Sequence, residues 1–338
     1  MTGTQMKSAP LKTASLQPVR PVPDATRSAI VEQTENGGDK YLWRAHTLAM
    51  AADGTVKGDF AANHLAFVPA EVKPGSLYVA RGEVDAMAAL GNGAAGCISE
   101  HPLRGPHVLV ADIEDALARI ARASRNRARA TMTGITGFGD NAPVAEVLND
   151  ALFRASRGMS WRAKDGLGMA AALCTLQADR THALFTLEEG REARMLRPHL
   201  LVCGHDLDHE EGRAIAATLQ AGGAAVLPAD SCDFGAWRAA ALDAGAQVYG
   251  YGRKASADIR LIDTVRLENG ETLVTAEMMG RAMCWSLASG VLEEGCDELS
   301  SLAIMGAMRA AGASLGAAAL ALAALPHEEE PAQLAIAV

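Results

Sequence analysis

Residues 128–158 constrain the fold more than any other stretch of the chain. They predict a buried strand over residues 131–135, a glycine-bearing turn over residues 136–141 and then a helix. Apolar residues of the helical part recur with the spacing of one helix face, namely at Val144, Val147, Leu148, Ala151, Leu152 and Ala155. Asp140 and Asn141 favour a helix N-terminus, and Pro143 is tolerated only in a first turn. The segment therefore predicts a strand–turn–helix unit.

The turn has the scaffold of a phosphate-binding loop, because backbone N–H groups and the helix dipole attract anions there. Its residues are Thr136, Gly137, Phe138, Gly139, Asp140, Asn141 and Ala142. A nucleotide-binding loop ends in Gly-Lys-Ser/Thr, where lysine contacts phosphate and the hydroxyl holds magnesium. Here Asp140, Asn141 and Ala142 occupy those places. Losing a charge-assisted hydrogen bond costs roughly 1.5–3 kcal/mol, and a carboxylate about 4 Å from a phosphate costs roughly 1–4 kcal/mol more. Taken alone, the turn is predicted to be an ordinary corner of an α/β sheet, with a working ATP loop as the alternative.

Strand-like and helical segments alternate after this unit. Apolar runs at residues 183–187, 200–203, 224–227 and 247–251 predict strands, residues 259–267 a further sheet segment, and residues 213–220 a helix. Such alternation predicts a mostly parallel sheet covered on both faces. Ligands of these sheets bind beyond the carboxyl ends of the strands. The candidate site therefore comprises residues at those ends, which are Thr136, Glu188, His205, Asp206 and Asp230.

The domain organisation predicted from the sequence is an α/β chain of two folded parts. Residues 1–40 are polar and Pro-bearing and predict a flexible tail, residues 41–127 a small N-terminal α/β module, residues 128–326 the central domain and residues 327–338 a second tail. Within the module, strands are expected at residues 65–68, 76–80, 96–99 and 108–110, with helices at residues 83–90 and after Asp112.

Two charged clusters each have two interpretations. His209 lies among Asp206, Asp208, Glu210 and Glu211, and this cluster predicts either a divalent-metal site or a polar loop that enters a helix with acids in its first turn. The second cluster contains Arg119, Arg122, Arg125, Arg127 and Arg129. It predicts either a phosphate or partner surface or a solvated helix C-terminus.

Composition excludes several classes of protein. The 338-residue chain has a net charge of -9, which argues against a general nucleic-acid binder. Its six cysteines are scattered without a CxxC pair, so they are expected to be reduced thiols of a cytoplasmic protein. No secretory hydrophobic region is expected at the N-terminus. Residues 302–325 are rich in Ala and Gly and carry Arg309, so they predict a buried helix pair rather than a membrane span.

The order of these motifs resembles the Mur ligases over about residues 72–325, most of all the UDP-N-acetylmuramoyl-tripeptide D-alanyl-D-alanine ligase (MurF) branch. The resemblance rests on residues 72–80, 93–98, 112–127, 134–137, 225–230 and 311–325, and on Glu146, Leu148 and Leu152 in the helix after the loop. It implies a UDP-binding N-terminal module and a central ATPase-like domain. It also implies ATP and Mg²⁺ as ligands, with Glu188 and His209 at the places of the family's magnesium-binding glutamate and histidine.

Four departures from the family pattern accompany the resemblance. The loop lacks its lysine and threonine, and residues 209–224 contain no lysine to bridge metals. Gly204, His205 and Asp206 replace an Asn-Ile-Gly stretch of the family. The family's third domain is not expected within the residues up to Val338. Together they favour a non-catalytic pseudoenzyme of peptidoglycan-precursor metabolism, which binds a UDP-sugar peptide, a genuine Mur ligase or another cell-wall enzyme. The alternatives are an active ATP-dependent amide ligase completed by another chain, and a structural interaction protein that forms a homo-oligomer.

Overall fold

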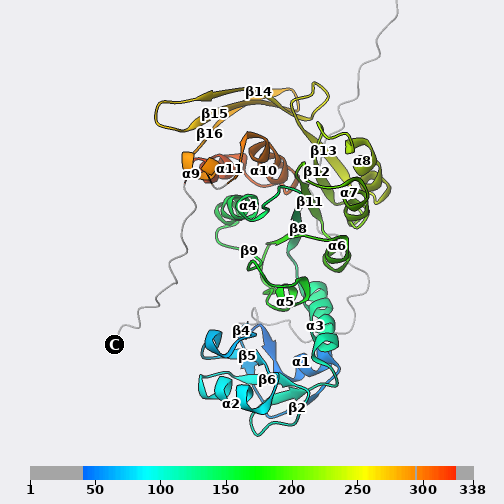
Figure 1. Cartoon of the computed structure of the whole chain (residues 1–338), viewed down its shortest axis with the longest axis vertical. Coiled ribbons are helices and arrows are strands. Elements are labelled where there is room, and N and C mark those ends of the chain that lie inside the picture. Colours follow the sequence, from blue (N-terminus) through cyan, green and yellow to red (C-terminus); the bar gives the residue numbers. More distant parts are fainter. Residues whose placement is uncertain (1–40, 294, 325–338) are drawn as a thin grey trace, which may run out of the picture.

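The computed structural model describes residues 41–293 and 295–324, and the two predicted tails, residues 1–40 and 327–338, lie outside the described residues. The described chain is elongated (Figure 1). The N-terminal module forms one end, and a larger sheet with its helices forms the rest, as the sequence predicts.

The N-terminal module is built on a five-stranded sheet in which only the edge strand β2 runs antiparallel. Its order is β2 (Thr55–Lys57), β7 (His107–Leu109), β6 (Gly96–Ser99), β5 (Ser76–Val79) and β4 (His64–Ala66). The other elements are β1 (Trp43–Arg44) paired with β3 (Ala61–Ala62), helices α1 (Ala45–Ala52) and α2 (Glu83–Gly91), and a 3-10 turn at Pro69–Glu71.

The central domain contains a nine-stranded sheet that is parallel from β9 to β14 and ends in an antiparallel hairpin. Its order is β16 (Arg281–Leu287), β15 (Thr272–Met278), β14 (Ile259–Arg266), β13 (Gln247–Gly252), β12 (Ala224–Pro228), β11 (Leu200–Cys203), β8 (Thr131–Thr136), β10 (His182–Thr186) and β9 (Ser160–Arg162). The α/β fold with a mostly parallel sheet is therefore confirmed.

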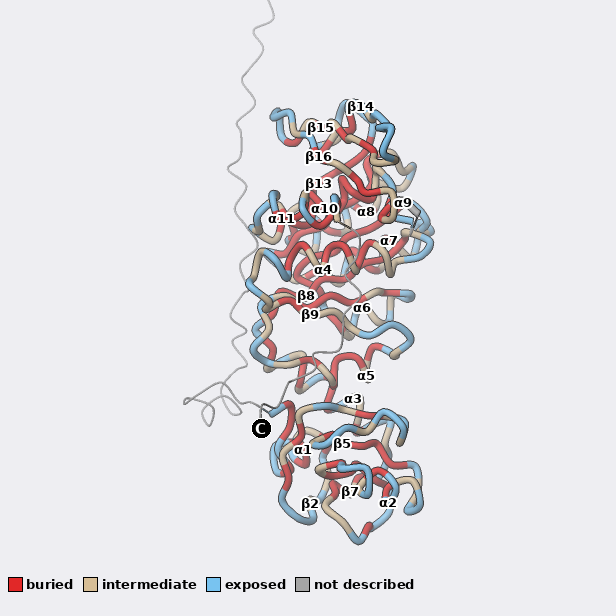
Figure 2. Tube along the Cα trace, turned by 90° about the vertical axis from the view of Figure 1, so that its left-hand side faces the viewer, coloured by how far each residue is buried: buried red, intermediate tan, exposed pale blue. Residues whose placement is uncertain are grey.

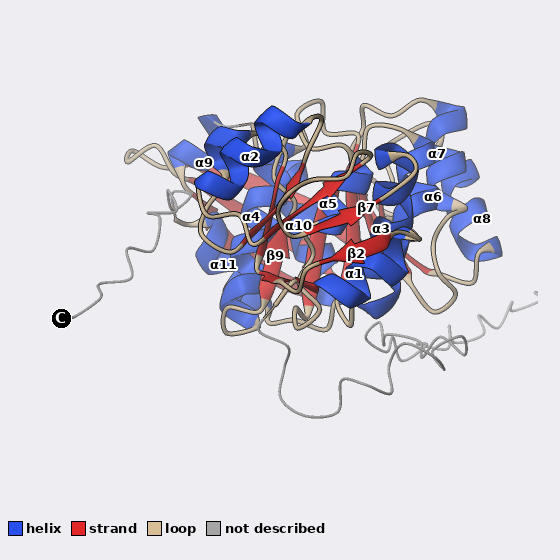
Figure 3. Cartoon of the chain, turned by 90° about the horizontal axis from the view of Figure 1, so that it is seen from below, coloured by secondary structure: helices blue, strands red, loops and turns tan. Residues whose placement is uncertain are grey.

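Helices cover both faces of this sheet (Figure 3). On one face lie α4 (Ala142–Ala155), α10 (Glu298–Ala310) and α11 (Leu315–Leu322), which pack on one another. On the other lie α5 (Met169–Cys174), α6 (Gly190–Leu196), α7 (His209–Ala216) and α8 (Phe234–Asp243). The remaining helices are α3 (Ile113–Arg127), which packs against α1 and α5, and α9 (Ser289–Glu293).

The strands divide their side chains between two cores, because successive side chains of a strand point to opposite faces. In β11, Leu200 and Val202 join the core under α4 and α10, whereas Leu201 and Cys203 join the core under α6 and α7. The second core continues through Ile120 of α3 into the N-terminal module. Figure 2 shows the buried trace running through both parts.

Two helical segments were predicted with different success. The helix predicted over residues 213–220 is wrong at both ends, since α7 is His209–Ala216. It begins early because the Asp208 carboxylate accepts a hydrogen bond from the Glu211 N–H (2.8 Å), and a tight turn at Thr218 ends it. The buried helix pair is confirmed, because Gly312, with a φ of 68°, separates α10 from α11. Among the described residues, no helix combines the length and apolar character required to cross a bilayer.

Candidate functional site

The sheet order brings the ends of four parallel strands to one edge. Strands β12, β11, β8 and β10 are consecutive neighbours and run in the same direction. The residues that follow them therefore lie along the carboxyl edge, where ligands of such sheets bind. Those residues are Asp230 after β12, His205 and Asp206 after β11, Thr136 at the end of β8 and Glu188 after β10.

The glycine turn is held by its own side chains. Gly137 and Gly139 have φ of 77° and 73°, a left-handed conformation that glycine adopts without steric cost. The Phe138 N–H donates to Oδ1 of Asn141 (3.1 Å), and the Ala142 N–H donates to Oδ1 of Asp140 (2.9 Å). Two amides of the loop are therefore already bonded to side-chain oxygens at the place where a phosphate-binding loop presents free N–H groups.

The segment after β11 packs directly on this turn. The Gly204 N–H donates to the Thr136 carbonyl (2.8 Å), and the Asp206 N–H donates to the Gly137 carbonyl (2.7 Å). A Cβ added at Gly139 would lie 3.1 Å from Oδ2 of Asp206. A second carboxylate, besides that of Asp140, thus stands beside the loop and opposes an anionic ligand there.

Glu188 and His209 are not brought together with a further ligand. The Glu188 N–H donates to Oε2 of Glu192 (2.7 Å), and the Glu188 side chain is exposed. Nδ1 of His209 lies 2.6 Å from Oδ1 of Asp233, so the imidazole is engaged by the segment before α8. Within residues 41–293 and 295–324, no group of three His, Cys, Asp or Glu side chains is arranged to hold a metal ion.

The remaining polar residues of the edge have structural partners. The Asp230 carboxylate accepts hydrogen bonds from the N–H groups of Arg253 (2.7 Å) and Lys254 (3.0 Å), which fixes the turn after β13. The His205 ring contacts Tyr251 edge-on, at 5.9 Å between centroids. Burial raises the pKa of the Cys203 thiol to about 12, so this thiol at the end of β11 is not a thiolate nucleophile.

A polar cavity of about 180 Å³ lies beside Glu188 and was not predicted from the sequence. It is lined by the loop after β9, the end of β10 and the first turn of α6, including Lys164, Gly166, Gly168, Phe185, Thr186, Glu188 and Glu192. Lys164 reaches Glu71 of the N-terminal module, with Nζ 3.1 Å from Oε1. The sequence does contain a signal for this cavity, namely two glycines, Gly166 and Gly168, shortly after Lys164. The signal was overlooked because the short strand β9 before it was not predicted.

A parallel sheet in which one strand leads through a glycine turn into a helix N-terminus defines the architecture of phosphate-loop α/β domains. More particularly, the chain has the fold of the Mur ligases, and structures of MurF are among those it resembles. A structure of MurF from Acinetobacter baumannii superposes with a TM-score of 0.68 at 17% identity and covers 84% of this chain and 67% of that one.

Two further solved structures agree with this assignment of the fold. UDP-N-acetylmuramoylalanyl-D-glutamyl-2,6-diaminopimelate--D-alanyl-D-alanyl ligase from Acinetobacter baumannii gives a TM-score of 0.68 at 18% identity, over 84% of this chain and 68% of that chain. MurF from Thermotoga maritima, solved with ADP, gives 0.58 at 21% identity, over 78% and 66%. The chain thus spans about two thirds of the length of these ligases. No protein-family model and no curated protein sequence matches it.

Proposed function

We propose that this protein is a non-catalytic Mur-ligase-fold module of peptidoglycan-precursor metabolism, which binds a UDP-N-acetylmuramoyl peptide or a cell-wall enzyme and does not use ATP. The observation that carries the proposal is the hydrogen bonding of the glycine turn. Phe138 and Ala142 direct their N–H groups at Asn141 and Asp140 instead of leaving them for phosphate.

The electrostatics of the turn support the same conclusion. Asp140 and Asp206 flank the loop, and the loop residues Thr136–Ala142 include no cation to offset these carboxylates. Phosphoryl transfer depends on cations that neutralise the charge developing on the phosphate oxygens. The resemblance implies Glu188 and His209 as a metal-binding pair. One of the two, His209, is instead hydrogen-bonded to Asp233.

The absence of ATP binding at the loop can be tested by following the amide signal of Phe138 in labelled protein. Protein labelled with ¹⁵N-phenylalanine has few signals, because the chain contains six phenylalanines. Addition of ATP and magnesium is expected to leave the Phe138 amide signal in place in the wild type. The triple variant Asp140→Gly, Asn141→Lys, Ala142→Thr restores the lysine and hydroxyl, and ATP is expected to shift that signal at micromolar concentration. A shift in the wild type at micromolar ATP would contradict the proposal.

The binding half of the proposal needs its own measurement. Calorimetric titration with a UDP-N-acetylmuramoyl peptide is expected to show binding without ATP. Absence of binding, both to this ligand and to a purified MurF, would leave the structural interaction protein as the better description.

The polar cavity beside Glu188 favours one other function, an ATP-dependent amide ligase that a second chain completes. Such a ligase forms an acyl phosphate that an amine attacks, which requires phosphate positioning and metal charge. ATP-dependent ligation by the protein mixed with a partner that supplies a third domain, lost on Glu188→Ala, would establish this function in place of the proposed one.

A further inference from the structure

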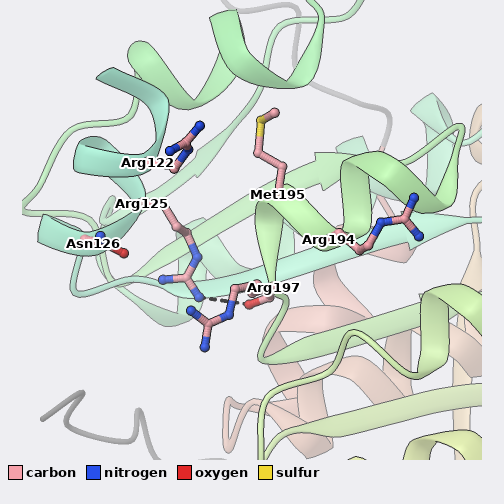
Figure 4. Close-up of a pocket in the computed structure, with 6 residues that line it drawn as sticks. All are labelled: Arg122, Arg125, Asn126, Arg194, Met195 and Arg197. Atoms are coloured by element: carbon pink, nitrogen blue, oxygen red, sulfur yellow. Dashed lines mark hydrogen bonds between the residues drawn. The ribbon is translucent and has the colours of Figure 1, made fainter. Parts of the chain in front are cut away.

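Arginines line a concave surface between the C-terminal ends of α3 and α6 (Figure 4). The cavity measures about 370 Å³. Its lining consists of Arg122, Arg125, Asn126, Arg194, Met195 and Arg197. Four of these six residues are cationic and none is acidic, although the chain as a whole has a net charge of -9.

Only one of the four guanidinium groups is committed to the fold. Arg125 donates hydrogen bonds to the backbone carbonyls of Leu196 and Arg197, the latter at 2.8 Å, and so caps the C-terminus of α6. The side chains of Arg122, Arg194 and Arg197 are exposed, and their guanidinium groups have no hydrogen-bond or ion-pair partner within the part of the chain that the structure describes. Like charges gathered without counter-charges repel one another, so the cavity is suited to an anion.

The cavity lies at the opposite edge of the sheet from the glycine turn. Helix α3 ends at Arg127 just before β8 begins, and α6 ends at Leu196 just before β11 begins. The arginines therefore lie near the amino ends of the strands, whereas Thr136, Glu188 and Asp206 lie at the carboxyl ends. A ligand in this cavity would not occupy the candidate site described above.

We propose that this cavity binds an oligophosphate group, that is, two or more linked phosphates of a small molecule. Guanidinium groups present planar forks that match phosphate oxygens in a bidentate manner, which favours them for phosphate recognition. A linked diphosphate offers several oxygens, so guanidinium groups from both α3 and α6 can contact it at the same time. The Met195 side chain supplies an apolar wall for the part of the ligand that carries the phosphates.

The size of the cavity and a buried neighbour support this ligand class. Small-molecule sites occupy about 300–1,000 Å³, and this cavity falls within that range. The neighbour is His199, whose pKa is lowered to about 4 by burial first and then by Arg125 and Arg197. The positive potential of the arginines thus reaches beyond the cavity wall.

The test titrates inorganic pyrophosphate into the purified protein without magnesium. Wild-type protein is expected to bind, and Arg122→Gln and Arg194→Gln are each expected to weaken binding by about 10-fold or more, the loss expected for one charge-assisted hydrogen bond. Both side chains are exposed and have no partner among the described residues, so neither change should unfold the protein. The control is Arg266→Gln, an exposed arginine on β14, four strands away from β8, which should bind as the wild type does.

Other titrants distinguish the sources of the phosphates. Tighter binding of ATP or UDP than of pyrophosphate would mark the ligand as a nucleotide, and equal affinities would mean that the phosphates alone are recognised. The proposed oligophosphate ligand is wrong if pyrophosphate does not bind, if its binding is unchanged in both arginine variants, or if an oligoglutamate binds in its place. Nucleotide bound here leaves the Phe138 amide signal unshifted, so this proposal and the proposed function fail separately.

Discussion

A Cβ added at Gly204 would lie 2.0 Å from the carbonyl oxygen of Gly137. The backbone after β11 is thus in close contact with the backbone after β8. The Asp206 N–H adds a hydrogen bond to the same Gly137 carbonyl, at 2.7 Å. Because Gly137 opens the loop, its conformation is set by the neighbouring strand as well as by the loop sequence.

The variant Gly204→Ala is therefore expected to be destabilised, by about 1–3 kcal/mol, because a backbone carbonyl cannot move aside as a flexible side chain can. Chemical denaturation measures this change. The control is Gly235→Ala, on the exposed side of α8, where an added Cβ meets no atom within 4 Å. That change should be neutral or stabilising by about 0.5–1 kcal/mol. Equal denaturation midpoints for the two variants would show that the glycine turn after β8 can move to accommodate the added Cβ.

Asn141→Ala should free the amide of Phe138. Asn141 supplies the acceptor for the Phe138 N–H at 3.1 Å, so the change should cost about 0.5–1.5 kcal/mol of stability and accelerate hydrogen exchange at that amide. Exchange followed by NMR tests this directly. The matched control is Asn126→Ala, an exposed asparagine on α3 for which no side-chain hydrogen bond is found in the described residues. If exchange at Phe138 is the same in both variants, the bond to Asn141 does not close the loop.

His199 should make the protein less stable in acid. Its Nδ1 accepts a hydrogen bond from the Met132 N–H (3.0 Å), and its pKa is lowered from 6.5 to about 4. Because the folded state resists protonation while the unfolded state accepts it, stability falls as the pH drops from about 6.5 to about 4 and is not lost further below that. The loss amounts to about 3 kcal/mol.

Denaturation midpoints between pH 7 and pH 4 provide the measurement. His199→Gln keeps an acceptor for the Met132 N–H but does not titrate, so its stability should fall less over this interval than that of the wild type. Parallel stability curves for the two proteins would mean that His199 is protonated without cost in the folded state.

Arg125→Ala should destabilise the protein by about 1.5–3 kcal/mol, because it removes charged hydrogen bonds to the last carbonyls of α6. Arg122→Ala, on the same helix, should change stability little, since Arg122 has no partner among the described residues. Thermal unfolding gives the melting temperatures of the two variants, whose changes lie within one turn of each other on α3. A similar melting temperature for both would contradict the capping role of Arg125.

Periodicity in the sequence predicted the elements whose buried residues are local and regular. The helix after the loop was correct on its apolar face, because Val144, Leu148 and Leu152 repeat at helical spacing and all three are buried. The start of α7 was predicted four residues too late, at Arg213, although one of the two interpretations of the acidic cluster placed its acids in a first helical turn. The hairpin β15–β16 was missed altogether, since its pairing joins residues whose register only the folded sheet determines.

The sequence by itself determined the fold class, the replacement of lysine and threonine by Asn141 and Ala142, and the placement of polar residues after strands. These follow from local composition and from the two backbone periods. Only the tertiary structure decided how the polar groups are used. Asn141 is bonded to Phe138, His209 pairs with Asp233, and Arg122 faces a cavity with Arg194, because each of these contacts depends on where separate segments meet in three dimensions.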